Sequence, residues 1–132
     1  TLLILDKQKD YMRNILLALC LISLLYGCNK ERVYKYIEVT EMQSPMGGVE
    51  TDYRPQQEIK AETDSAAYMQ AFQKFCIAAR ANAEIVAKTG NVVARPVRFK
   101  LMDDTGTDLV PTLTFANKEE REQEVIDLVF KK

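Results

Sequence analysis

The segment TDSAAYMQAFQKFCIAARANAEIVAKTG, residues 63–90, decides the fold of this chain. Thr63-Asp64-Ser65 supplies residues that cap a helix N-terminus, and Gly90 supplies a stop, so we expect a helix over Ala66–Lys88. At about 100° per residue, one stripe of this helix is apolar and the opposite face is polar. The apolar stripe comprises Tyr68, Phe72, Phe75, Ala79, Ala83 and Val86. Such a helix must cover the apolar face of another layer.

Alternating segments around this helix predict that the other layer is a sheet. Before the helix, Val33–Met42 alternates and is rich in β-branched and aromatic residues, as a half-buried strand requires. We expect one face of this strand to carry Val33, Ile37 and Val39, and the other face Tyr34, Tyr36 and Thr40. The glycines and prolines of segment 43–57 predict an extended loop, with a brief strand over Val49–Arg54.

A hairpin is expected after the helix. Val92–Met102 alternates in its second half, and the DDTGTD sequence of residues 103–108 has the composition of a turn. Leu109–Phe115 would then return as the second strand of an antiparallel pair. Because Pro111 cannot donate a ladder hydrogen bond, we place that strand at an edge or a bulge.

A second, shorter helix is expected at the C-terminal end. Asn117 would cap the sequence NKEEREQEVIDLVFKK, and Glu120 occupies the capping-box position. The complete pattern predicts an α+β fold, in which a small, mainly antiparallel sheet of three or four strands has two helices packed on one face. The expected order is strand, brief strand, helix, strand, strand, helix. A chain of 132 residues has room for one such domain.

The beginning of the chain shows a different pattern, in which a positive charge, a short apolar run and a small residue follow one another. Arg13 stands next to Met12, and the eleven residues 15–25 are apolar except for Ser23. This run is too short to cross a bilayer core, which needs about 20 residues. We therefore expect a secretory signal at residues 12–27, with synthesis starting at Met12 and residues 1–11 being upstream or miscalled-start sequence.

The end of this segment, Leu25-Tyr26-Gly27-Cys28, resembles the lipobox of bacterial lipoprotein signal peptides. The resemblance implies cleavage between Gly27 and Cys28 and attachment of a diacylglycerol to the Cys28 sulfur. It also implies an envelope protein held in a membrane by lipid, on the periplasmic side of the outer membrane or at the cell surface. The exported domain would comprise residues 28–132, with a short tether before its first strand.

The DDTGTD loop contains Asp104-Thr105-Gly106, which resembles the Asp-Thr-Gly signature of aspartic proteases. The resemblance would make Asp104 the catalytic carboxylate. That family pairs two such aspartates over one shared proton, whereas this chain has one copy, with Asp103 where an apolar residue is usual. A calcium site formed by the three aspartates of the loop lacks EF-hand spacing. We therefore expect a turn here, and no metal site.

Composition excludes several classes of function. The chain has no histidine, which rules out Ser-His-Asp and Cys-His catalysis and histidine-based zinc sites. A net charge of −1 with both signs interspersed gives no reason to expect nucleic acid or an anionic membrane surface as the main partner. Cys76 lies beside the apolar stripe of the long helix and is expected to be a small core residue. We expect no cofactor and no catalytic residue.

Three side chains are candidate partner contacts. Ile77 falls on the polar face of the long helix, where a monomer has no use for it. Tyr34 and Tyr36 lie on the second face of the first strand, and surface aromatics favour contacts with proteins or sugars. The basic side chains of segment 95–100 line the outer face of a later strand, which we interpret as a solvated sheet face, with an acidic partner as the alternative.

These observations predict a lipid-anchored envelope protein that is not an enzyme and acts by binding or scaffolding another envelope component. Two alternatives stay open. One is a carboxylate-based hydrolase that uses the DDTGTD loop, and the other is a carrier that holds a small ligand between the sheet and the helices. The oligomeric state is not defined by the sequence.

Overall fold

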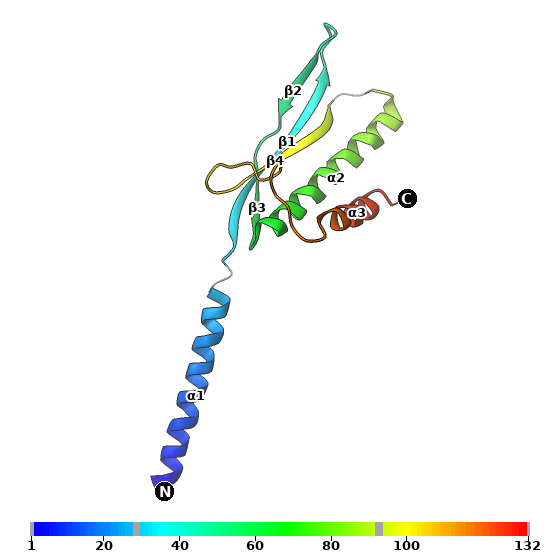
Figure 1. Cartoon of the computed structure of the whole chain (residues 1–132). Coiled ribbons are helices and arrows are strands. Elements are labelled where there is room, and N and C mark those ends of the chain that lie inside the picture. The colour runs from blue at the N-terminus through cyan, green and yellow to red at the C-terminus, as the bar shows by residue number, and fades with distance from the viewer. Residues whose placement is uncertain (1, 28–29, 92–93, 132) are drawn as a thin grey trace. The chain divides into compact units, whose positions relative to one another are not determined.

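The computed structural model describes residues 2–27, 30–91 and 94–131, which form two compact units, Thr1–Lys30 and Glu31–Lys132. The first unit is the helix α1 (Leu2–Gly27) (Figure 1). This helix runs from Leu2 to Gly27 without interruption at Met12, and the proposed start at Met12 stays a prediction. Across the described parts of the chain, no helix combines the length and apolarity needed to span a bilayer.

The second unit is built around one central strand. β1 (Arg32–Gln43) pairs antiparallel with β2 (Val49–Tyr53), with β3 (Gln57–Ala61) and with β4 (Arg95–Met102). Residues 35–36 of β1 pair with both β3 and β4, and residues 39–41 with both β2 and β4. Since a strand has only two edges, β2 and β3 share one edge of β1, and β4 occupies the other (Figure 1).

The long helix α2 (Asp64–Thr89) has the caps that the sequence predicts. The Thr63 Oγ1 accepts a hydrogen bond from the Ala66 amide at 3.1 Å, which satisfies one of the donors left open at a helix start. At the other end Gly90 has a φ of 70°, and its amide donates to the Val86 carbonyl, a left-handed cap that a glycine adopts without a Cβ clash. The expected helix is confirmed to within two residues at each end.

The last helix α3 (Lys118–Val129) is present, but its start differs from the expectation. Asn117 precedes the helix with a φ of 60°, and its side chain makes no capping hydrogen bond. In this left-handed conformation the residue turns the chain into the helix through its backbone, which asparagine tolerates better than most residues. The predicted side-chain cap at Asn117 is therefore wrong.

The expected return strand over Leu109–Phe115 is also wrong. This segment forms turns, with the Leu113 amide donating to the Leu109 carbonyl at 2.8 Å. Within the described residues, pairing with β4 is limited to one bridge between Met102 and Asp108. Four apolar side chains of the segment, those of Leu109, Val110, Leu113 and Phe115, pack against the core instead. Burial of these side chains stabilises the turn conformation. Pro111 has no amide hydrogen to donate to a strand ladder, so pairing as a strand would gain less.

The fourth strand of the sheet, β3, was not predicted. β3 reads QEIKA, and Ile59 and Ala61 are 2% and 5% exposed while their neighbours lie at the surface. The segment is only five residues long, so its alternation is too short to separate from loop sequence. With β3, and with β2 as expected, the sheet has four strands and both helices lie on one face of it, which is the α+β architecture predicted (Figure 1).

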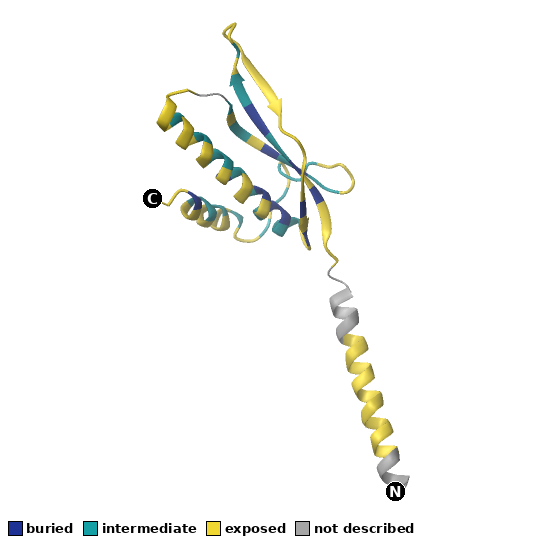
Figure 2. Cartoon of the chain, turned by 180° about the vertical axis from the view of Figure 1, so that it is seen from behind, coloured by how far each residue is buried: buried dark blue, intermediate teal, exposed yellow. Residues whose placement is uncertain are grey.

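The core lies between this sheet and the first half of α2. Its buried members are Tyr34, Tyr36, Ile59, Ala61, Ala67, Tyr68, Ala71, Phe99 and Leu101. Ala67 and Ala71 are fully buried, so α2 approaches the sheet closely where the tyrosines stand. The second half of α2 extends past this core, and Ala83, expected on the buried stripe, is exposed (Figure 2).

Replacement of Leu101 by alanine is expected to lower the free energy of unfolding by about 2–5 kcal/mol, because the side chain is fully buried and leaves a cavity. The measurement is urea unfolding of residues 31–132 followed by circular dichroism. Leu128→Ala is the matched control: this leucine is 66% exposed, so its loss is expected to cost less than about 0.5 kcal/mol. Equal costs for the two variants would contradict the core described above.

Candidate functional site

Ile77 lies at a groove between α2 and α3. Its side chain is 53% exposed and Leu128 of α3 is 66% exposed, so two large apolar side chains face solvent within one hollow of about 410 Å³. The groove is lined by Gln73, Ile77, Arg80, Ala81, Glu84, Leu128 and Val129. The expectation that Ile77 is available at the surface is met, and the partner contact itself stays a prediction.

Arg80 fixes the walls of this groove. Its Nε donates to Glu84 Oε1 at 3.1 Å along α2, and its Nη1 donates to the Val129 carbonyl at 2.6 Å. The second bond ties the C-terminal end of α3 to α2, where helix carbonyls have no intrahelical donor. A cation at this end of α3 is also favoured by the helix dipole. The groove thus has an apolar floor and a rim with both charges.

The remaining contacts of α3 explain why Leu128 is left outside. The residues of this helix that lie wholly or partly inside are Lys118, Glu122, Val125, Ile126 and Val129, and they follow the spacing of one helix face. Leu128 falls off that face. The sequence analysis identified Ile77 but missed Leu128. Leu128 could have been noticed as an apolar residue that lies outside the buried face of a short, highly charged helix.

Tyr34 and Tyr36 are not surface residues, which corrects their assignment as candidate partner contacts. Each is 1% exposed and belongs to the core. The Tyr34 hydroxyl donates to Asp64 Oδ1 at 2.6 Å, and burial together with this bond raises the pKa of Tyr34 to about 12. The Tyr36 hydroxyl donates to Glu38 Oε2 at 3.4 Å, and burial raises its pKa as well. Alternation separates the two faces of a strand without saying which one the helices cover.

The DDTGTD loop uses its aspartates to hold its own backbone. Asp103 Oδ1 accepts from the Thr105 amide at 3.0 Å, from the Thr105 hydroxyl at 2.6 Å and from the Thr107 amide at 2.9 Å. The hydrogen bond from Thr105 is the main cause that lowers the pKa of Asp103. Gly106 has a φ of 81°, which only glycine adopts readily. The expected turn is confirmed.

The two other aspartates of the loop do not join Asp103 in a site. Asp108 Oδ1 accepts from the Leu101 and Val110 amides, both at 3.1 Å, and so fixes the chain to the end of β4. Asp104 points into solvent. Among the side chains that the structure describes, no cluster of three or more His, Cys, Asp or Glu residues is arranged to hold a metal ion.

Cys76 is buried, as expected, with 4% of its surface exposed. Burial, followed by the nearby Glu122 carboxylate, raises the pKa of the thiol, and a raised pKa reduces the thiolate fraction that a nucleophile needs. The space between sheet and helices is filled by aromatic rings: the Phe99 centroid lies 5.7 Å from that of Tyr36, 5.7 Å from that of Tyr68 and 5.5 Å from that of Phe75. Cys28 lies outside the described residues.

Comparison of the chain with protein-family models, with curated proteins and with solved structures yields no match.

The hydrogen bonds of the turn predict that two adjacent aspartates differ in their contribution to stability. Asp103→Ala is expected to lower the unfolding temperature of residues 31–132 at pH 7, whereas Asp104→Ala leaves it unchanged. Because the pKa of Asp103 is lowered in the folded state, its contribution is present above the unfolded pKa of about 3.9 and fades as pH falls through the folded value. The difference between wild type and Asp103→Ala should therefore shrink on acidification, which thermal unfolding at several pH values measures. A loss for Asp104→Ala as large as that for Asp103→Ala would argue against this account of the loop.

Proposed function

We propose that this chain is a lipid-anchored protein of the bacterial envelope, without catalytic activity, that binds or scaffolds another envelope component. The observation that carries the proposal is the order of Arg13, the apolar run 15–25 and Leu25-Tyr26-Gly27-Cys28. A thiol is the side chain that forms a thioether with a diacylglyceryl group, and the glycine before it gives the peptidase access to the backbone. The sequence without histidine supports the absence of catalysis.

The division of the chain into units supports the same proposal. The boundary between the units falls after Lys30, two residues beyond Cys28. Every member of the core cluster belongs to residues 31–132. Cleavage before Cys28 would therefore leave the folded unit complete, with its apolar core intact.

Lipid on Cys28 would hold this unit at a membrane without inserting it. Each buried methylene contributes about 0.8 kcal/mol, so one acyl chain binds marginally and two or three chains bind firmly. Since Cys76 would then be the one unmodified cysteine of residues 28–132, the domain would have no intrachain disulfide, and its stability would come from packing.

The groove between α2 and α3 is the surface that we assign to the partner. We propose that a partner protein inserts one apolar side chain between Ile77 and Leu128, while polar groups of the partner meet the Arg80–Glu84 pair at the rim. An apolar centre surrounded by polar groups is the common arrangement of protein interfaces. The volume of about 410 Å³ is sufficient for one large side chain.

The lipid is tested by mass spectrometry of the protein produced in a bacterium. The expected product begins at Cys28 and carries two or three acyl chains, and Cys28→Ala should abolish both the added mass and the partition into detergent. Cys76→Ala is the matched control and should keep the lipid, since this thiol is buried in the folded unit. An unmodified Cys28 thiol on an uncleaved leader would refute the anchor.

The groove is tested by a photo-crosslinking residue in place of Leu128 in living cells. One discrete protein adduct is expected, and Ile77→Asp should reduce it roughly tenfold or more, because burying an isoleucine contributes about 1.5–3 kcal/mol. Ile85→Asp is the control: this isoleucine lies on the same helix with 51% exposure but outside the groove. Equal loss in both variants, or an adduct that neither variant changes, would exclude the groove as the contact.

A further inference from the structure

The sheet has one face without a helix layer. The register places Val33 opposite Lys60, Ile37 opposite Lys100, and Val39 opposite both Tyr53 and Arg98. These side chains share the face that points away from the core, because the buried Tyr34 and Tyr36 alternate with them along β1. We call this surface the open sheet face. Its exposed and partly exposed members are Val33, Lys35, Ile37, Glu41, Tyr53, Glu58, Lys60, Arg95, Arg98, Lys100 and Met102, whereas Val39 on the same face is fully buried.

Positive charge is concentrated on the open sheet face. Lys35, Lys60 and Arg98 are exposed, and the Lys100 Nζ lies 5.1 Å from the centroid of the Tyr53 ring. None of these four cations makes an ion pair within the described residues. Glu58, opposite Lys35, is an acidic residue that the register places among them. Glu41, which lies on the same face, is paired with Arg95 at 3.6 Å.

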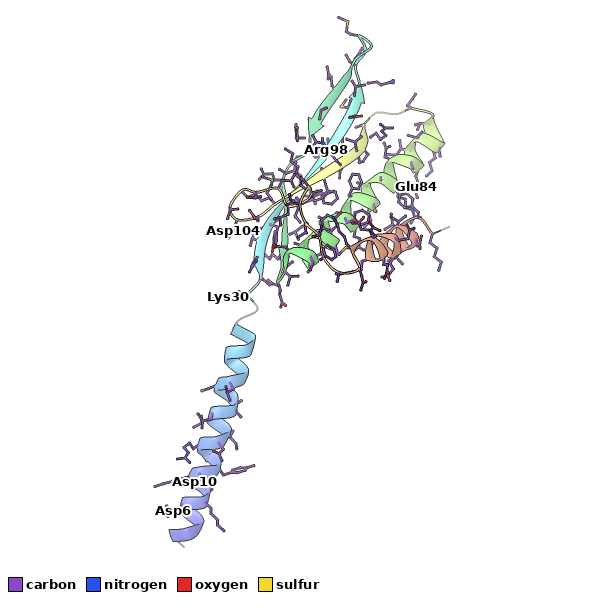
Figure 3. All side chains as sticks on the ribbon, in the orientation of Figure 1. Asp6, Asp10, Lys30, Glu84, Arg98 and Asp104 are labelled. Carbon is purple, nitrogen blue, oxygen red and sulfur yellow. The ribbon has the colours of Figure 1, made fainter. Side chains whose placement is uncertain are left out.

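The helix α3 has the opposite charge. In twelve residues, α3 carries Glu119, Glu120, Glu122, Glu124 and Asp127 against Lys118 and Arg121. The net charge of −1 for the whole chain is therefore unevenly distributed, with cations on the open sheet face and an excess of carboxylates on α3. Arg98 on β4 and Glu84 on α2 mark the two layers (Figure 3). A surface with this polarity is oriented by an anionic plane, which attracts one side of the domain and repels the other.

The length of the tether says which anionic surface is within reach. Four residues lead from Cys28 to Arg32, where β1 begins, and at roughly 3.5 Å per residue they span at most about 14 Å. β1 itself has twelve residues and is about 40 Å long at roughly 3.3 Å per residue. With lipid on Cys28, the start of β1 stays within about 14 Å of the headgroup layer, and the remainder of the domain can reach that layer by tilting.

We propose that the open sheet face docks on anionic lipid headgroups of the bilayer that holds the acyl chains. The inference rests on the proposed anchor, which supplies the proximity, and on the four cations without an ion pair in the described part of the chain, which supply the complementarity. Lys and Arg near an anionic bilayer are attracted within a Debye length of its surface. The exposed Val33 and Tyr53 add apolar and aromatic contacts at headgroup depth. Docking through this face directs the helix layer, with the groove of Ile77 and Leu128, away from the membrane toward a partner.

The test uses the fragment Glu31–Lys132, which contains the whole core but no lipid, so that binding reports the face alone. Co-sedimentation with vesicles of phosphatidylglycerol and phosphatidylcholine should exceed that with phosphatidylcholine alone and should fall as salt is raised. The double variant Lys35→Ala, Lys60→Ala should bind on the order of 25-fold more weakly, at about fivefold per cation. Circular dichroism and the thermal transition verify that each variant is folded.

A matched pair of cations outside the face provides the control. Lys88→Ala, Lys131→Ala removes the same charge from exposed positions of α2 and the end of the chain, and it should change binding less than twofold. Equal weakening by the two double variants, or no preference for phosphatidylglycerol, would overturn the proposal. Stronger binding to soluble polyglutamate than to vesicles would overturn it in favour of an acidic protein. Failure of the lipid anchor would appear separately, in the mass at Cys28.

Discussion

Two buried tyrosines, each bonded through its hydroxyl to a carboxylate of another element, link the sheet, α2 and α3 of the folded unit. Tyr34 of β1 reaches Asp64 at the start of α2, and Tyr68 of α2 reaches Glu122 of α3 at 3.2 Å. A buried hydroxyl without an acceptor is costly, so each bond also restricts where the neighbouring element can lie. The rings fill the space between the layers, and the carboxylates determine which edge of that space each helix end meets.

The position of the buried rings explains why only the first half of α2 packs closely against the sheet. The first half of α2 has Ala67 and Ala71 against the sheet, and the helix comes close enough there to cover the rings. Farther along, the sheet side chains that would fill the interface are missing, and Ala83 and Ile85 are exposed. α3 covers part of that length and is tied to it by Arg80 and the Val129 carbonyl. Because α3 is shorter than α2, it leaves part of α2 uncovered, and the groove beside Ile77 lies there.

The two layers also divide the proposed tasks of the protein. α2 covers one face of the sheet and α3 packs against α2, so the other face remains available for a flat surface such as a bilayer. The apolar groove lies in the helix layer and the cations lie on the open sheet face. A short tether and a basic sheet would restrict the orientation of the domain, and restricted orientation lowers the entropy that a partner must remove on binding.

Local patterns in the sequence determined a large part of the fold. The caps of α2 at Thr63 and Gly90, the strand around Val39 and the turn at Asp103–Asp108 follow from side-chain chemistry within a few residues, and the sequence was sufficient for them. The proposed leader and the proposed lipid on Cys28 also rest on local sequence, since a peptidase and a lipid transferase would act on a short segment. Tertiary structure alone decided which face of β1 the helices cover, because alternation with period two is the same for both faces of a strand. It also decided that Leu109–Phe115 packs as a turn and that Leu128 stands beside Ile77, because both depend on contacts between residues far apart in the chain.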